Sequence, residues 1–162
     1  MSNDNNEIFE QATRDSQLVQ ALDQVLIDSQ VFRQKAHTYH WNVEGPLFHS
    51  LHEFFGDIYE EMEDSVDEIA EHIRTLGAYP TSGFSEYAEN THISNPEPSS
   101  DLESGVMISD LLSSNEDLID TIVQAEDVAE SAGNEPVLDF VIERHDQHSM
   151  YGWKLFAHSR HG

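Results

Sequence analysis

The chain has 162 residues, with 32 acidic residues against 7 basic ones, a formal net charge of −25 and no cysteine. This composition excludes disulfides, thiolate metal ligands and cysteine nucleophiles, and it disfavours binding to nucleic acid or anionic lipid. No apolar stretch has the length of a membrane span and the first residues lack signal-peptide features, so we expect one domain over residues 1–162 in the cytoplasm.

Two long helices are predicted in the first half of the chain. Apolar residues recur at helical spacing from about residue 11 to 41 and again from about 47 to 76. Gly45-Pro46 marks the turn between them, and Gly77 is the expected C-cap of the second. Residues before about 11 are expected to form a mobile tail. The residues predicted to face the core are Leu18, Leu22, Val25, Phe32, Ala36, Leu51, Phe55, Ile58, Met62, Val66, Ile69 and Ile73.

A polar stretch over residues 78–100 separates these helices from two more. It is long for a loop, so we expect a short helix within it, at residues 84–89. The third long helix is predicted over 101–131 and the fourth over 136–158. Their predicted inward residues are Met107, Leu111, Ile119, Ile122, Val123, Leu138, Val141, Ile142 and Phe156. Two antiparallel helix pairs joined by a long crossover indicate an all-α, ferritin-like four-helix bundle.

Two histidines lie where the first two helices meet. His40 ends the first helix beside Trp41, and His52 lies one to two turns into the second. The turn at Gly45-Pro46 folds these helix ends together, so both imidazoles are expected on one side of the bundle. For either histidine alone, a hydrogen-bonded position in or near the core is the commoner explanation.

Two carboxylates, Asp67 and Glu71, are four residues apart on the second helix and share a face. Taken alone they indicate a solvated acidic stripe. His52 and Asp67 are 15 residues apart (67 − 52), which is about 22 Å of axial rise, and metal–ligand bonds are near 2 Å. One ion therefore requires the carboxylates of a second copy, related by a two-fold axis. Imidazole and carboxylate ligands with open positions suit Fe²⁺.

A site inside one bundle is not expected. Conventional ferritins need a Glu-x-x-His motif on each of two helices. This sequence has that motif only at Glu89 and His92, within the crossover.

The segment His40-Trp41-Asn42-Val43-Glu44-Gly45-Pro46-Leu47-Phe48, followed by Leu51-His52-Glu53, Tyr59 and Asp67-Glu68-Ile69-Ala70-Glu71, resembles the signature of the Dps mini-ferritins. Dps stands for DNA-binding protein from starved cells. The resemblance implies a hollow shell of twelve subunits that oxidises Fe²⁺ at two-fold interfaces, with hydrogen peroxide or O₂ as oxidant, and stores the ferric product.

By this resemblance, His40 and His52 are metal ligands from one subunit, and Asp67 and Glu71 are ligands from its partner. These four residues form the catalytic site. Trp41 lies beside it, where its ring could intercept a radical, although a core aromatic position explains it equally well.

One position departs from the family pattern, which usually places a carboxylate four residues after the second histidine. Here that residue is Gly56. Asp57 is a candidate substitute, but it lies about 100° further round the helix. The alternative function is therefore a metal-binding cage without efficient oxidation. His37 and His72 are further candidates, with supporting or surface roles favoured for both.

Three carboxylates near the start of the last helix, Glu130, Glu135 and Asp139, resemble the acidic pore through which Fe²⁺ enters in this family. An acidic, capped helix start explains them equally well.

Direct DNA binding is not expected, because twelve chains would carry 12 × −25 = −300 formal charges. The acidity itself is attributed mainly to adaptation to high salt. Solvated surface positions are expected for His145, His148, His158 and His161.

Overall fold

A computed structural model describes the backbone of residues 3–160 and the side chains of residues 15–160. Its helices are α1 (Asn3–Asn42), α2 (Phe48–Thr75), α3 (Phe84–Asn90), α4 (Ser104–Ala132) and α5 (Glu135–Ser159). The described residues contain no strand. The predicted all-α fold, with its short helix in the crossover, is confirmed. Helix α1 begins before residue 11, and the side chains of the predicted mobile tail lie outside the described residues.

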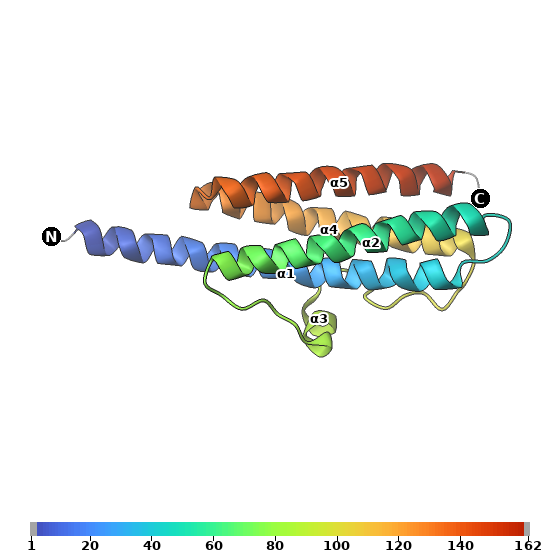
Figure 1. The fold of residues 1–162 in the computed structure, drawn as a ribbon, viewed down its shortest axis with the longest axis horizontal. Coiled ribbons are helices and arrows are strands. Elements are labelled where there is room, and N and C mark those ends of the chain that lie inside the picture. Colours follow the sequence, from blue (N-terminus) through green and yellow to red (C-terminus); the bar gives the residue numbers. More distant parts are fainter. Residues whose placement is uncertain (1–2, 161–162) are drawn as a thin grey trace.

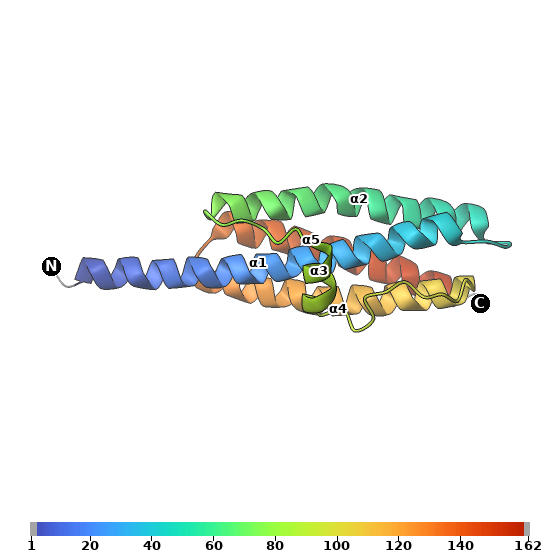
Figure 2. The ribbon, with the colours of Figure 1, turned by 90° about the horizontal axis from the view of Figure 1, so that it is seen from below.

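The four long helices form two antiparallel pairs, α1 with α2 and α4 with α5 (Figure 1). Helix α1 packs against both α2 and α4, so it connects the two pairs. The crossover between α2 and α4 carries α3 across the outside of α1 (Figure 2). None of the described helices combines the length and the apolar character needed to cross a bilayer.

One hydrophobic core runs through the bundle, and each fully buried Leu, Ile or Phe side chain contributes roughly 1.5–3 kcal/mol to it. The inward residues predicted for α1 are all buried, and those of α2 are buried apart from the partly exposed Val66. In α4, the predicted Ile119 and Val123 are partly exposed, and the core positions belong to Leu118 and Ala125.

The inward face predicted for α5 is wrong at two positions. Ile142 is 48% exposed and Phe156 is 51% exposed. The buried face instead follows helical spacing through residues that include two polar side chains: Val137, Phe140, Val141, Arg144, His148, Tyr151 and Leu155. The helix is therefore turned relative to the prediction, and its core face carries charge.

Polar side chains of α1 hold the crossover against the bundle. Asp23 accepts hydrogen bonds from the backbone and hydroxyl of Thr81, at 2.8 and 2.6 Å. Asp28, which is fully buried, accepts from the His92 backbone at 2.7 Å and from the Thr91 hydroxyl at 2.6 Å. Because buried carboxylates require such partners, these contacts fix the first half of the crossover.

The second half of the crossover is held by Lys35 and Tyr39. The buried Lys35 ammonium donates to the Asn95 carbonyl at 2.6 Å and to Asp110 at 2.9 Å. The Tyr39 hydroxyl donates to Asp110 and accepts from the Ser99 backbone at 2.7 Å. The long crossover thus has specific partners along its whole length.

Candidate metal centre

The structure brings His40 and His52 together at the end of the bundle where α1 and α2 are joined. Their rings stack with centroids 3.9 Å apart and an interplanar angle of 18°. Each ring bonds to the other residue's backbone: His40 Nδ1 lies 2.7 Å from the His52 carbonyl oxygen, and His52 Nδ1 lies 2.7 Å from the His40 carbonyl oxygen. The predicted juxtaposition of these two residues is therefore present in a single chain.

These bonds determine which ring nitrogen of each histidine carries a proton. A carbonyl oxygen can only accept a hydrogen bond, so Nδ1 of each histidine must carry the proton. In the neutral ring, Nε2 then has a free lone pair, as a metal ligand requires. The His40 carbonyl is available because α1 ends at Asn42, which leaves it without a helical donor.

Gly56 makes this arrangement possible. A Cβ at position 56 would lie 3.0 Å from His40 Nδ1 and 3.1 Å from its Cε1. The residue four positions after His52 flanks the His52 carbonyl, so its lack of a side chain lets the His40 ring reach that oxygen. The glycine that interrupts the family pattern is thus a close-contact position, which offsets its unfavourable helix propensity.

A pocket in front of the two histidines carries three further carboxylates. His40 and His52 line it together with Gly56, and the acidic residues are Glu53, Asp57 and Glu60. Asp57 was a candidate from the sequence, and it borders the same pocket. Glu60 was missed, although its spacing of eight residues from His52 places it on the same face of α2. The pocket thus has oxygen ligands available despite the glycine.

Asp67 and Glu71 do not meet the histidines within one chain. Both side chains are exposed on α2, more than four turns along the helix from His52. Among residues 15–160, no three His, Asp or Glu side chains cluster closely enough to hold a metal ion. The four predicted ligands are therefore two separate pairs in the isolated chain.

A polar network occupies the centre of the bundle, and sequence reasoning missed it. Arg144 on α5 forms an ion pair with Glu61 on α2, and the Tyr151 hydroxyl donates to Glu61 at 2.7 Å. His148 is fully buried, with Nδ1 2.8 Å from Asn115 Oδ1 and Nε2 3.3 Å from Arg144. A guanidinium in this position opposes metal binding inside the bundle.

The network corrects the expectation that His148 is a solvated surface residue. Burial, with a smaller contribution from the Arg144 charge, lowers the pKa of His148 well below its ordinary value. The ring is therefore neutral, and it accepts a hydrogen bond from Arg144 while donating to Asn115. Of the other histidines, His145 is partly exposed and pairs with Glu126 at 2.7 Å, and His161 lies outside the described residues.

His37 lies next to the histidine pair, one turn earlier on α1. Its ring stacks on the Tyr59 ring, with centroids 3.9 Å apart, and its centroid lies 4.0 Å from that of the Trp41 ring. Burial, with the Arg33 charge second, lowers the pKa of His37 below its ordinary value. Both predicted neighbours of the site, His37 and Trp41, thus belong to one aromatic cluster.

The three predicted pore carboxylates surround the α4–α5 turn. Glu130, Glu135 and Asp139 are all exposed. Gly133 adopts a left-handed conformation with φ 68°, and Asn134 caps α5 by accepting from the Val137 backbone at 3.1 Å. The cap accounts for the turn itself, and the three carboxylates are left facing solvent.

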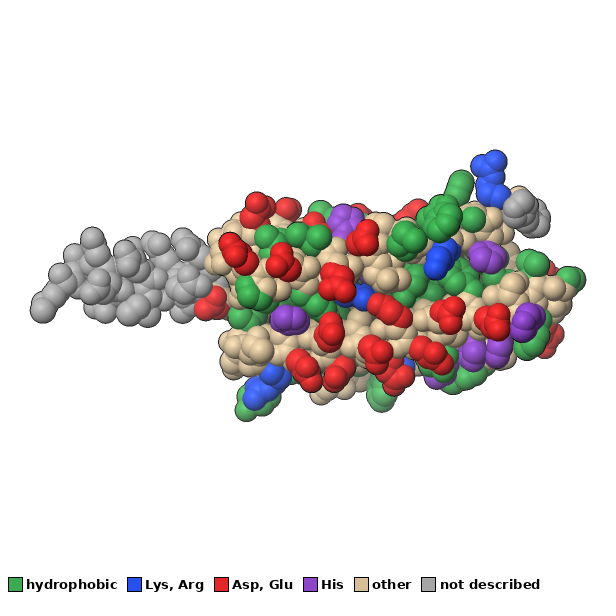
Figure 3. Space-filling model, turned by 45° about the horizontal axis from the view of Figure 1, so that its top comes forward, with side chains coloured by type: hydrophobic (Ala, Val, Ile, Leu, Met, Phe, Trp, Pro, Cys, Tyr) green, Lys and Arg blue, Asp and Glu red, His purple; other side chains and the backbone are tan. Residues whose placement is uncertain are grey.

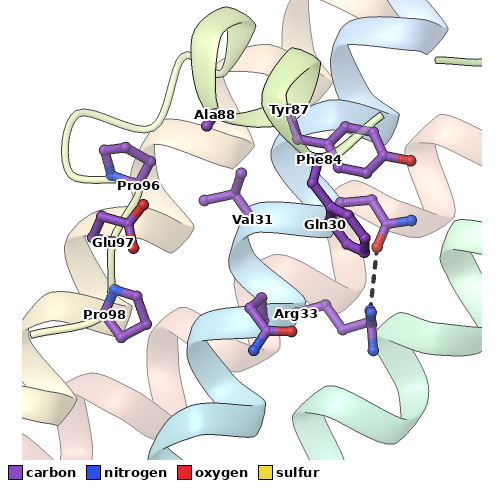
Figure 4. A pocket seen from close by; sticks show the side chains of 10 residues that line it. Gln30, Val31, Arg33, Phe84, Tyr87, Ala88, Pro96, Glu97 and Pro98 are labelled. Carbon is purple, nitrogen blue, oxygen red and sulfur yellow. Dashed lines mark hydrogen bonds between the residues drawn. The ribbon is translucent and has the colours of Figure 1, made fainter. Parts of the chain in front are cut away.

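A second pocket lies between α1 and the crossover (Figure 4). Phe84 and Tyr87 of α3 form one wall, and Arg33 borders it with a 3.3 Å hydrogen bond to Gln30. None of the predicted metal ligands lines this pocket. Of these two pockets, the histidine pocket is therefore the one lined by predicted metal ligands.

Acidic side chains are spread over the described face of the molecule that Figure 3 shows. On the face shown in Figure 3 they follow the long helices, while histidines gather towards the end where α1 and α2 are joined. Such a surface attracts cations and repels polyanions.

Comparison with known proteins gives consistent matches. The ferritin-like domain family matches residues 19–160. The DNA protection during starvation protein of Brevibacillus brevis is 31% identical over 128 residues, which is 76% of this chain and 85% of that protein. The structure of Dps from Thermosynechococcus elongatus superposes with a TM-score of 0.85 at 25% identity, covering 91% of this chain and 93% of that one.

A third match carries a description of its chemistry. Dps from Vibrio cholerae O1 superposes with a TM-score of 0.84 at 27% identity, over 90% of this chain and 91% of that one. That protein is described as a member of a broad superfamily of ferritin-like diiron-carboxylate proteins.

Proposed function

Because this chain belongs to the Dps family of ferritin-like proteins, we propose that it oxidises Fe²⁺ at two-fold subunit interfaces and stores the ferric product in a closed shell of twelve copies. Hydrogen peroxide or O₂ is the oxidant, and iron is both substrate and cargo. Family membership by itself supports iron storage or DNA protection. The more specific proposal, oxidation of Fe²⁺ at a subunit interface, depends on the geometry of the site.

The mutual hydrogen bonds of His40 and His52 are the observation that carries it. Holding both Nδ1 atoms as donors, at 2.7 Å each, leaves Nε2 of each ring as the atom that can bind a metal. Backbone bonds of this kind orient metal-binding histidines and raise their basicity. Both histidines also line an open pocket with carboxylates beside it, which a pair of core histidines without a metal role would not need.

The remaining ligands come from the partner in this proposal. Asp67 and Glu71 are exposed and four residues apart, so a second α2 running antiparallel can bring them to the pocket. Two carboxylates balance the charge of Fe²⁺ and stabilise Fe³⁺ more strongly, which favours the oxidation. Glu53, Asp57 and Glu60 border the same pocket, and they offer oxygen ligands to a second, weaker iron position.

Iron is supplied through the acidic surface. A formal charge of −25 per chain concentrates cations near the shell, and Glu130, Glu135 and Asp139 repeated round a three-fold axis would focus that field at an entry pore. The same charge opposes direct contact with DNA. We therefore propose that the protein is an iron-detoxifying store that does not bind DNA directly. We propose that it acts in the cytoplasm.

Anaerobic loading with Fe²⁺, followed by a measured pulse of peroxide, tests the function. Iron and peroxide should be consumed in a fixed ratio, and the double variant Asp67→Ala, Glu71→Ala should lose this reaction. The matched control is Asp64→Ala, Glu68→Ala, which removes the same charge at the same spacing from a face of α2 turned by about 60°. A wild-type protein that binds Fe²⁺ but leaves it ferrous would instead be a non-catalytic cage.

A further inference from the structure

The polar network at the centre of the bundle gathers around a single guanidinium nitrogen. Nη2 of Arg144 lies 3.1 Å from Glu61 Oε2 and 3.3 Å from His148 Nε2. The thioether sulfur of Met62 is 3.5 Å from the same nitrogen. A carboxylate, an imidazole and a thioether, carried by α2 and α5, thus face one positive charge.

The His148 ring is held with a lone pair towards this charge. Asn115 Nδ2 donates to the His148 carbonyl at 2.9 Å, so Asn115 Oδ1 is left to accept from His148 Nδ1 at 2.8 Å. Burial lowers the pKa of His148, so the ring is neutral and Nε2 carries no proton. A hydrogen-bonded Nδ1 behind a free Nε2 is the arrangement in which proteins hold metal-binding histidines.

The Glu61 carboxylate has a supporting partner as well. The Tyr151 hydroxyl donates to Glu61 Oε2 at 2.7 Å, and carboxylates that bind metals commonly have such a hydrogen bond. An ion pair needs only the two opposite charges of Glu61 and Arg144. The neutral imidazole and the thioether add no charge to that pair, but both are metal ligands.

We propose that this centre is a divalent-metal site in which the Arg144 guanidinium takes the place of the ion. Arg144 thereby excludes iron and similar metals from the interior of the bundle. Nitrogen, oxygen and sulfur ligands together suit first-row ions such as Fe²⁺, Co²⁺ and Zn²⁺. The inference does not depend on the proposed function, because all of these residues belong to one chain.

Removing the guanidinium should open the site to a metal ion. The Glu61 carboxylate would lose its positive partner, and a largely desolvated charge without a partner is unfavourable. The distances to Nη2 exceed metal–ligand bonds of about 2.0–2.3 Å by roughly 1 Å. The Glu61 side chain is 34% exposed, so it is free to turn towards an ion and offers a route from the surface.

The test measures Co²⁺ binding to the assembled protein by visible absorption. Excess Mg²⁺ occupies the surface carboxylates, because it prefers oxygen ligands. Every sample also carries His40→Ala and His52→Ala, which removes the interface histidines. Protein that retains Arg144 should show only the weak absorption of hydrated Co²⁺. Arg144→Ala should bind a single Co²⁺ per chain, with the stronger bands of a protein-bound ion.

Two controls separate a metal site from general loosening of the core. Arg144→Lys keeps a positive charge at this position and should bind no Co²⁺. Adding His148→Gln to Arg144→Ala should weaken Co²⁺ binding by at least about 10-fold, since loss of even a ligand's supporting group costs that much. Free guanidinium at millimolar concentration should displace Co²⁺ from Arg144→Ala, because both cations occupy the same position.

Arg144→Gln repeats the test in case Arg144→Ala is unstable. A variant that unfolds without metal should be recovered by Co²⁺, because an ion that binds only the folded chain stabilises it. Three results overturn the inference: folded variants that bind no Co²⁺, binding that His148→Gln leaves unchanged, and unfolded variants that Co²⁺ does not recover. None of them affects the proposed function, which is tested separately by Fe²⁺ oxidation in the wild type.

Discussion

The imidazole of His40 packs against the backbone of Gly56, where a side chain would otherwise lie: a Cβ at position 56 would be 3.0 Å from His40 Nδ1. The ring uses that space to reach the His52 carbonyl. A side chain at position 56 therefore requires the His40 ring to shift by a few tenths of an ångström. The departure from the family pattern thus lies directly against one of the two proposed histidine ligands.

Gly56→Ala tests this relationship. Alanine should improve helix propensity by roughly 1 kcal/mol, but its methyl group must displace the His40 ring and weaken the bond that orients it. We expect affinity for Fe²⁺ or Zn²⁺, measured by anaerobic calorimetry, to fall about 10–100-fold, as for other groups that orient metal ligands.

The matched control for that variant is Gly105→Ala, because a Cβ at this position in α4 meets nothing within 4 Å. It should leave affinity unchanged. Equal affinity in the Gly56 and Gly105 variants would show that the glycine has no part in orienting His40.

The core network should be important for stability. Arg144→Met removes a donor from His148 Nε2 and leaves the Glu61 carboxylate with the Tyr151 hydroxyl in place of its ion pair, at a cost of about 1–3 kcal/mol in the free energy of unfolding. Denaturant unfolding at fixed protein concentration measures this. Arg74→Met, on the exposed end of α2, should change stability by less than about 0.5 kcal/mol; similar losses in both variants would argue against the network.

His148 should make stability depend on pH. Its pKa in the folded chain is well below the ordinary value of 6.5, so below pH 6.5 the unfolded chain binds more protons than the folded one. The contribution of neutral His148 to the free energy of unfolding is therefore complete above pH 6.5. It declines as the pH falls towards the pKa of the folded chain, by up to about 1.4 kcal/mol per pH unit. Unfolding at several pH values should show a shallower decline for His148→Gln; parallel curves would contradict this.

The charge of the chain predicts weak interaction with DNA. With −25 formal charges per subunit, a gel-shift assay at low salt and without divalent cations should show no complex, because no set of basic side chains is available to release counterions from phosphate. Adding Mg²⁺ can bridge the two acidic surfaces. A firm shift in the absence of divalent cations would contradict the assignment.

The histidine site was largely predictable because its signals are local. His40 and His52 flank a Gly-Pro turn that can only fold the two helix ends together, and the distance along α2 separates His52 from Asp67 whatever the packing. The role of Gly56 was not predictable, since it depends on the orientation of a ring on another helix.

Helix α5 was harder to predict for a physical reason. Its buried face contains Arg144 and His148, which a hydrophobic pattern passes over, while Ile142 and Phe156 are apolar but half-exposed in the single chain. Periodicity locates a helix and its apolar side chains, but it cannot distinguish an apolar face that packs in the core from one that is exposed in the single chain. It also cannot detect a buried ion pair whose two members lie on different helices.

Mixed assemblies give the sharpest test of whether each iron site takes ligands from two chains. One chain would carry His40→Ala and His52→Ala and the other Asp67→Ala and Glu71→Ala, co-expressed with different tags and purified through both. Each homogeneous variant should be inactive. In a mixed two-fold pair, one site loses all four ligands and the other keeps all four, so peroxide-dependent Fe²⁺ oxidation should recover. Mixed assemblies as inactive as the separate variants would show that the iron site is not shared in this way.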